Sequence, residues 1–189
     1  DARGGGDGDG GGAPRIVIVT SMSGKLPAPL LSSYGASKHA ATAFAACIRM
    51  ELSHQWGIHV CTALPSFHKT PLIDGGVPTL VRLWGALPAA IKALYGEPCA
   101  TSCFRAADEM MTGCAWDPER VTEALKRVVT RTEPPPCELV VGGDALFGLQ
   151  AMRHLPPPVY EAIFWYFVCW NMCMPQKAAA AGNANGKRE

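Results

Sequence analysis

The sequence of 189 residues lacks the marks of several protein classes. It has no block of like charge, and its net charge of +1 gives no reason to expect a nucleic-acid partner. It contains no Cys-x-x-Cys pair, and its 8 cysteines are too few for a disulfide scaffold. We therefore expect reduced, mostly buried thiols in an intracellular protein whose partner is a small molecule or another protein.

The start of the sequence lacks the apolar core of a secretory signal peptide. Residues 1–12 form a glycine and aspartate tract that is typical of a flexible linker, so we expect residues 1–14 to be disordered. An initiating methionine is also lacking, and we interpret the chain as the C-terminal part of a longer protein. We expect disorder again in residues 175–189, which are rich in alanine, glycine and asparagine.

Between these ends, residues 15–174 carry the pattern of a folded α/β domain. Residues 15–20 are a continuous β-branched run, typical of a strand that is buried on both faces. From residue 33 to residue 56, apolar residues recur at steps of three and four, which predicts a helix that Gly57 ends. Residues 58–64 form a second buried-strand pattern. This order of strand, helix and strand predicts a βαβ unit in a parallel sheet.

The second half of the chain has a looser pattern. Residues 72–114 are rich in glycine, proline and scattered apolar residues, which favours short helices that form a lid over an apolar pocket. A further helix is predicted after this segment, with Asp117 as its N-cap and Pro118 at its first position. Residues 138–141 are predicted to form a third strand.

Residues 160–174 are strongly apolar and aromatic. This segment contains Glu161 and is shorter than the ~20 residues that a helix needs to span a bilayer. Two interpretations remain open. The segment packs on the sheet edge or on a dimer partner, or it lies in a membrane interface, where tryptophan and tyrosine are favoured. In the second case the protein would associate with the endoplasmic reticulum or mitochondrial membrane.

A pair of residues near the start of the predicted helix carries chemistry. Tyr34 and Lys38 are four residues apart, so both side chains emerge on one face of the helix. A phenol is ordinarily a weak acid with a pKa near 10, and a nearby ammonium favours its phenolate form. Ser21 follows the preceding strand, where a hydroxyl can hold the oxygen that gains or loses the proton. The three residues suit general acid–base chemistry on an alcohol.

The same residues carry a family resemblance. The stretch Arg15-Ile-Val-Ile-Val-Thr-Ser21, with Tyr34-Gly-Ala-Ser-Lys-His-Ala after it, resembles the active-site region of the short-chain dehydrogenase/reductase family. The family's serine lies 13 residues before its tyrosine, which selects Ser21. The resemblance implies that Tyr34 is the general acid/base and that Ser21 steadies the substrate oxygen. It also implies that Lys38 favours the phenolate of Tyr34 and binds the ribose hydroxyls of the nicotinamide cofactor.

A second matching segment follows the second predicted strand. The family carries Pro-Gly-x-x-x-Thr there, wrapped around the nicotinamide, and this chain reads Pro65-Ser66-Phe67-His68-Lys69-Thr70. The match implies that Pro65 and Thr70 bind the cofactor, with Thr70 at the carboxamide. Ser66 departs from the usual glycine. We interpret His68 as a loop residue without a chemical role.

The later half of the chain resembles the retinol and the 11β- and 17β-hydroxysteroid dehydrogenases of this family. The resemblance implies NAD or NADP as cofactor, a lipophilic steroid- or retinoid-like substrate, and a homodimer formed through the 33–56 helix. The implied fold is a Rossmann-like parallel sheet with helices on both faces. Its N-terminal half, including the glycine-rich turn that binds the pyrophosphate, has no counterpart in this sequence.

Three hypotheses about function follow from these observations. The chain is part of an NAD(P)-dependent oxidoreductase that interconverts a lipophilic alcohol and its carbonyl compound. Alternatively, it is a truncated fragment without turnover, because half a parallel sheet leaves an open edge. The third hypothesis is a dimerisation module that acts through the helix that begins near Tyr34.

Overall fold

The structure is a computed structural model that describes residues 12–29, 31–71, 75–113, 115–143 and 150–172; within these ranges it leaves the side chains of 110–112, 150 and 167–172 undescribed. Of the segments predicted to be disordered, residues 1–11 and 175–189 therefore lie outside the description.

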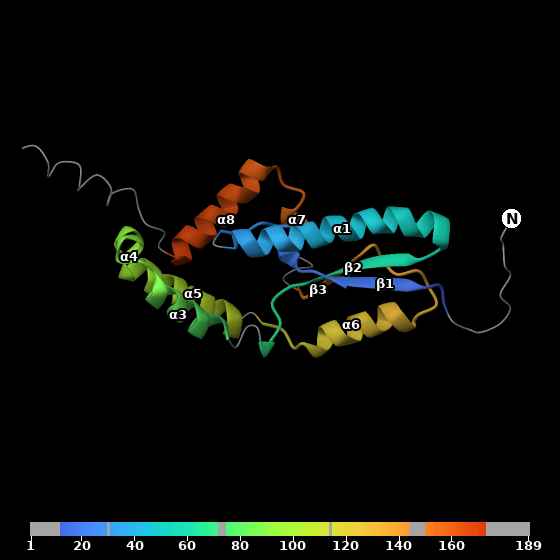
Figure 1. The fold of residues 1–189 in the computed structure, drawn as a ribbon, viewed down its shortest axis with the longest axis horizontal. Helices are drawn as coiled ribbons and strands as arrows, with labels where there is room; N and C mark the ends of the chain where they lie inside the picture. Colours follow the sequence, from blue (N-terminus) through green and yellow to red (C-terminus); the bar gives the residue numbers. More distant parts are fainter. Residues whose placement is uncertain (1–11, 30, 72–74, 114, 144–149, 173–189) are drawn as a thin grey trace, which may run out of the picture.

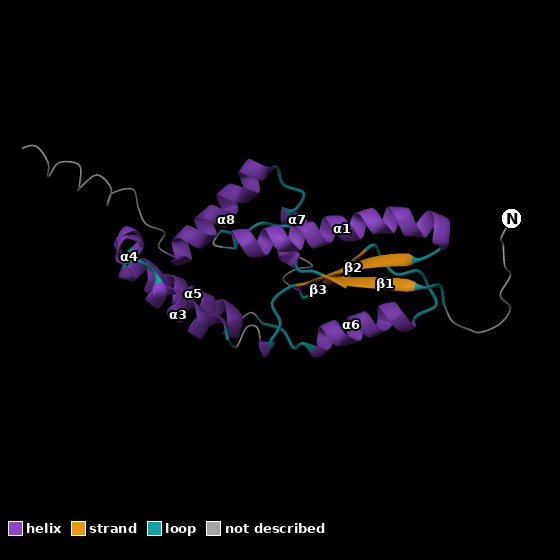
Figure 2. Ribbon diagram, in the orientation of Figure 1, coloured by secondary structure: helices purple, strands orange, loops and turns teal. Residues whose placement is uncertain are grey.

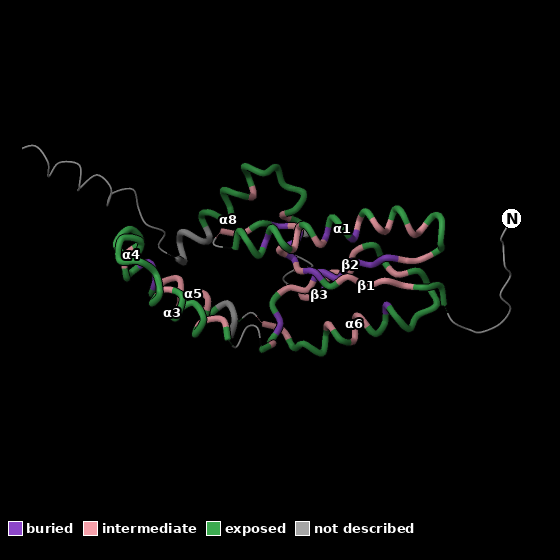
Figure 3. Tube along the Cα trace, in the orientation of Figure 1, coloured by how far each residue is buried: buried purple, intermediate pink, exposed green. Residues whose placement is uncertain are grey.

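A parallel sheet lies at the centre of the described residues (Figure 1). Its three strands follow the order β1 (Arg15–Val19), β2 (His59–Pro65) and β3 (Glu138–Val141). All three confirm the strands predicted from the sequence. The middle strand, β2, is buried from residue 60 to residue 64, as Figure 3 shows, because it has a neighbour on each side. Parallel pairing brings the carboxyl ends of the strands to the same edge of the sheet.

Two helices cover opposite faces of this sheet (Figure 2). Helix α1 (Ser32–Trp56) packs on β2, and helix α6 (Glu119–Thr130) packs on β3. The helix predicted over residues 33–56 is thus confirmed. It ends at Gly57, whose φ of 64° is left-handed, a conformation that glycine adopts without strain.

The start of α6 differs by one residue from the prediction. The α-helix begins at Glu119 and Pro118 is its N-cap, because the Pro118 carbonyl accepts the first i to i+4 hydrogen bond, from Thr122 N at 3.2 Å. The Asp117 carboxylate accepts a hydrogen bond from Glu119 N at 2.9 Å. Asp117 therefore satisfies one of the unpaired N–H groups at the start of the helix, which is the capping role that the sequence predicts for it.

The predicted lid is helical. Helices α3 (Gly76–Ala86) and α4 (Ala89–Tyr95) pack on α5 (Glu97–Gly113), which is longer than the short helices that the sequence predicts. The aromatic segment forms α8 (Pro157–Met172), which also packs on α5 and follows the short α7 (Gln150–Met152). Figure 1 shows these helices grouped beyond one end of the sheet.

None of the described helices is by itself long and apolar enough to cross a bilayer. Together α3 and α4 have that length and composition, but the pair is bent by 118°.

The cysteines are less buried than predicted. Among the described cysteines, Cys61 and Cys99 are buried, whereas Cys47 and Cys137 are exposed. The prediction of mostly buried thiols is therefore wrong for this part of the chain, because Cys47 lies on the exposed side of α1 and Cys137 just before β3. None of the described cysteines forms a disulfide, and burial raises the pKa of the Cys61 thiol.

Candidate active site

The candidate site begins at the carboxyl end of β1. Buried Thr20 follows the strand, and both its backbone N–H and its hydroxyl donate to the carbonyl of Ala63, at 2.9 and 3.1 Å. These two bonds fix the chain just before Ser21. Because Val19 pairs with Ala63 in the parallel register, Ser21 follows β1 at the level where β2 ends with Pro65.

Ser21 is oriented by the turn that it begins. Its side-chain oxygen accepts a hydrogen bond from Ser23 N at 3.2 Å and so caps the 3-10 helix η1 (Met22–Gly24). A serine hydroxyl has one donor and two acceptor positions, and accepting this bond does not use its O–H. The Ser21 hydroxyl can therefore donate to a substrate oxygen while its own oxygen is held in place.

Gly24 lets this turn approach α1 closely. A Cβ atom at position 24 would lie 2.8 Å from the carbonyl oxygen of Lys38 and closer still to the hydroxyl of Thr42. That hydroxyl in turn donates to the Lys38 carbonyl at 2.9 Å. From the sequence, Gly24 indicates only that a loop follows the first strand. The structure shows that it positions the Ser21 turn against the part of α1 that carries Lys38.

Tyr34 and Lys38 lie together at the start of α1. The Lys38 Nζ atom is 5.6 Å from the centroid of the Tyr34 ring, within the range over which a cation and an aromatic face attract each other. The Tyr34 side chain is 37% exposed and Lys38 is half-buried, so a substrate can reach the phenol. The arrangement agrees with the shared helix face that the sequence predicts.

The segment from Pro65 to Thr70 is held on two sides. Ser66 N donates to the Val141 carbonyl of β3 at 2.9 Å. Further along, Lys69 N donates to the Trp116 carbonyl, and Trp116 N donates to the Phe67 carbonyl, each at 2.9 Å. Thr70 follows this bridge and is half-buried.

His68, which the sequence suggests is a loop residue without a chemical role, is buried, with 5% of its surface exposed. Its Nδ1–H donates to the Ser66 carbonyl at 3.0 Å, which leaves Nε2 as an acceptor. This Nε2 atom is buried, and no partner for it is found among the described residues. The local sequence carries no signal for this burial, because it depends on the bridge to Trp116.

An ion-pair network ties the Ser21 loop to the last strand. The Glu138 carboxylate of β3 contacts Lys25 Nζ at 2.5 Å and Arg153 Nη1 at 2.7 Å. Burial of the Glu138 carboxyl raises its pKa, but the hydrogen bonds and charges of the two cations outweigh burial and hold the pKa below its ordinary value. Lys25 lies four residues after Ser21, so the network also anchors the candidate site. Sequence reasoning did not identify these three residues.

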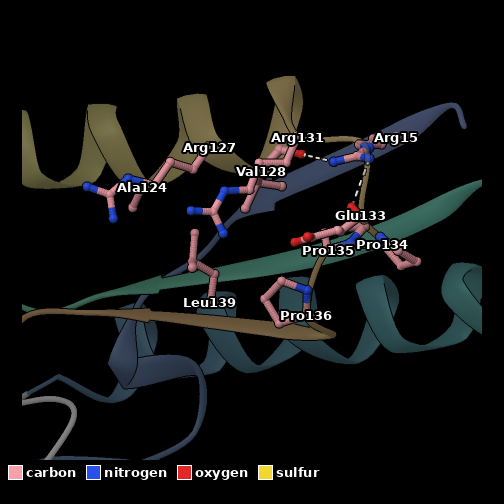
Figure 4. A pocket seen from close by; sticks show the side chains of 10 residues that line it. All are labelled: Arg15, Ala124, Arg127, Val128, Arg131, Glu133, Pro134, Pro135, Pro136 and Leu139. Carbon is pink, nitrogen blue, oxygen red and sulfur yellow. Dashed lines mark hydrogen bonds between the residues drawn. The ribbon is translucent and has the colours of Figure 1, made fainter. Parts of the chain in front are cut away.

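The surface has two hollows, one near this site and one far from it. One of about 610 Å³ lies between loop residues 27–29 and α8, and aromatic side chains from Tyr160, Phe164 and Trp165 line it. The other, of about 280 Å³, lies at the amino end of the strands, where Arg15 and residues of α6 surround it (Figure 4). The first borders the loop that joins Ser21 to Tyr34, whereas the second lies at the opposite end of the sheet.

Comparison with known proteins agrees with this geometry. Residues 9–76 match the family described as short chain dehydrogenase. Retinol dehydrogenase 16 of Rattus norvegicus is 28% identical over 166 residues, which cover 87% of this chain and 50% of that protein. The 17-beta-hydroxysteroid dehydrogenase type 2 of Homo sapiens is 49% identical over 86 residues, 44% of this chain and 22% of that protein.

A solved structure shows the same fold. A short-chain dehydrogenase from Streptomyces avermitilis superposes with a TM-score of 0.52 at 21% identity, over 82% of this chain and 51% of that one. The chain is therefore similar to short-chain dehydrogenases over residues 9–76, and it has the predicted Rossmann-like parallel sheet. It spans about half the length of the curated retinol dehydrogenases that it matches.

Proposed function

We propose that this chain carries the catalytic part of an NAD(P)-dependent oxidoreductase that interconverts a lipophilic alcohol and its carbonyl compound. The observation that carries the proposal is the position of Lys38 Nζ, 5.6 Å from the ring of an accessible Tyr34. The similarity to short-chain dehydrogenases supports the oxidoreductase class, and the roles of the individual residues are our proposal.

In the direction of oxidation, the Tyr34 phenolate takes the proton of the substrate hydroxyl. Lys38 supports the phenolate through its positive charge, and the Ser21 O–H donates to the substrate oxygen and holds it beside the phenol. In reduction the same groups return the proton to the carbonyl oxygen. A typical contribution of such acid–base catalysis is about 10²–10⁴-fold in rate.

The side chains at the carboxyl edge of the sheet fit the nicotinamide end of a cofactor. Lys38 offers an ammonium donor for ribose hydroxyls, the half-buried Thr70 offers a hydroxyl for the carboxamide, and Pro65 at the end of β2 begins the segment that would wrap the nicotinamide. When bound there, the nicotinamide supplies the acceptor or donor of hydride. We place no residue of this chain at a ribose 2′ position, so the proposal includes both NAD and NADP.

The proposed substrate is steroid- or retinoid-like. The hollow beside loop 27–29 has a volume of about 610 Å³, within the range of small-molecule sites, and aromatic side chains of α8 line it. The names of the similar proteins, retinol dehydrogenase and 17-beta-hydroxysteroid dehydrogenase, agree with an apolar alcohol.

We also propose a homodimer through α1, which would allow the chain to act as an interaction module. Large apolar side chains on this helix are exposed, among them Phe44 at 59%, Met50 at 66% and Trp56 at 69%. Such a surface suits a partner helix. Light scattering of the chain tests this proposal: a dimer that Met50→Glu dissociates supports it, and a monomer contradicts it.

The reaction is tested with a panel of steroid and retinoid alcohols and with NAD or NADP, using the chain and the longest natural protein that contains it. We expect cofactor-dependent turnover that Tyr34→Phe abolishes. Tyr95→Phe removes the same hydroxyl from α4 and should leave turnover unchanged. Turnover that survives Tyr34→Phe would refute the proposed acid–base role. Turnover by the longer protein but not by this chain would support the hypothesis that the chain is a fragment without turnover.

A further inference from the structure

The bent pair of helices α3 and α4 presents an unusually apolar surface. Neither helix has a buried residue in the structure. Large apolar side chains on both are exposed, including Val81 at 49%, Leu83 at 53% and Leu94 at 64%. Exposed apolar patches of this kind mark binding surfaces on folded proteins.

The pair is nevertheless held as a unit, because polar contacts close it. Lys92 Nζ of α4 donates to the Gly85 carbonyl near the end of α3 at 2.8 Å. The Trp84 indole N–H of α3 donates to the Glu97 carboxylate at the start of α5 at 3.2 Å. The exposed leucines are therefore presented by a braced hairpin of helices rather than by a loose segment.

The charges on this hairpin have one sign. Residues 76–95 contain Arg82 and Lys92 and no aspartate or glutamate. The nearest following acid, Glu97, already accepts the bond from Trp84. Helices that bind at the surface of an anionic bilayer combine an apolar face with basic residues and interfacial aromatic residues. The hairpin has this composition, with Tyr95 as an aromatic residue.

A second copy of the chain fits this surface less well. A symmetric dimer places the same patch on both sides of the interface, so it would bring Arg82 near the Arg82 of the other copy. The hairpin has no acidic residue that could neutralise this pairing. Anionic lipid headgroups supply the missing charge, and the acyl region takes up the exposed leucines.

We infer that the α3–α4 hairpin is a membrane-docking element that lies in the interface of an anionic bilayer. The bend of 118° lets both helices lie along the surface instead of crossing it. Helix α8, which packs on α5, also exposes Val159, Ile163 and Tyr166 at steps of four and three residues, at 45%, 45% and 67%. This docking does not depend on the proposed reaction.

Flotation of the whole chain with vesicles tests the docking. The vesicles contain about four parts phosphatidylcholine to one part phosphatidylserine, and a second set contains phosphatidylcholine alone. Leu83→Glu and Leu94→Glu should each reduce binding at least about tenfold, because a charge replaces a side chain that enters the interface. Val129→Glu on α6 changes a residue that is 59% exposed and should bind like the unmodified chain. Arg82→Gln should weaken binding about fivefold on the anionic vesicles only.

The inference would be overturned by no flotation of the unmodified chain, by equal loss of binding in Val129→Glu and Leu83→Glu, or by unchanged binding in both leucine variants. If the unmodified chain does not float and Leu83→Glu halves its mass in light scattering, the surface binds a second copy of the chain, which also overturns the inference. Circular dichroism and thermal unfolding confirm that each variant is folded. Tyr34→Phe should float like the unmodified chain, which separates docking from catalysis.

Discussion

The ammonium nitrogen of Lys38 lies 5.6 Å from the centre of the Tyr34 ring, one turn further along α1. The relationship is local, because residues four apart on a helix share a face. The helix alone does not position the third residue of the candidate site, Ser21. The turn that Ser21 begins packs on α1 through Gly24, whose missing side chain leaves room for the Lys38 carbonyl.

Gly24→Ala should therefore destabilise the chain by about 1–3 kcal/mol, because the added methyl group overlaps backbone and side-chain atoms of α1. Unfolding in urea measures the effect. Gly85→Ala is the matched control, since no atom lies within 4 Å of a Cβ at position 85 and alanine favours a helix more than glycine does. It should stabilise the chain by up to about 1 kcal/mol. Equal effects of the two substitutions would contradict the packing role of Gly24.

Glu138 predicts a loss of stability in acid. Its pKa is held below the ordinary value near 4.3, so the ion pairs with Lys25 and Arg153 stabilise the fold fully above that value. The contribution is lost as the pH falls through the lower value of the folded state. Between about pH 7 and pH 3, the midpoint temperature of thermal unfolding should fall more steeply for the unmodified chain than for Glu138→Gln.

The control for this prediction is Glu123→Gln on α6. Glu123 pairs with Lys126 at 3.7 Å, but both side chains are exposed, and such surface pairs contribute little. If Glu123→Gln flattens the pH dependence as much as Glu138→Gln does, the network at β3 has no special role.

Arg15 should stabilise the end of α6. Its guanidinium on β1 donates to the carbonyls of Val128 and Glu133, and Figure 4 shows these bonds. The Val128 carbonyl is one of the last in α6, where no helical partner remains and a positive charge is favourable. We expect Arg15→Met to lower the free energy of unfolding by about 1.5–3 kcal/mol. Arg105→Met, at a side chain that is 69% exposed, should leave it within about 0.5 kcal/mol.

Sequence reasoning located the elements whose signals are local. The β-branched run of β1, the three- and four-residue steps of α1 and the stop at Gly57 all appear in the structure as predicted. The start of α6 differs by one residue, because the prediction placed Pro118 in the helix, whereas the Pro118 carbonyl accepts the first i to i+4 hydrogen bond and the helix begins at Glu119.

The remaining contacts depend on residues far apart in the chain. Arg15 and Val128 are separated by 113 positions, and no periodicity in the sequence pairs them. The burial of His68 likewise depends on the bridge to Trp116, which the local segment does not announce. Gly24 could be marked as a turn residue from the sequence, but only its distance to Lys38 shows why a glycine is needed.

The most direct test of the account is a double-mutant cycle on Tyr34 and Lys38, measured as kcat at saturating cofactor in the natural protein that contains this chain. Tyr34→Phe should reduce kcat by about 10²–10⁴-fold, and Lys38→Met should reduce it as well. If Lys38 acts through the phenol, the double variant should be no slower than Tyr34→Phe alone. Losses that multiply in the double variant would show that the two residues act independently and would contradict the central claim.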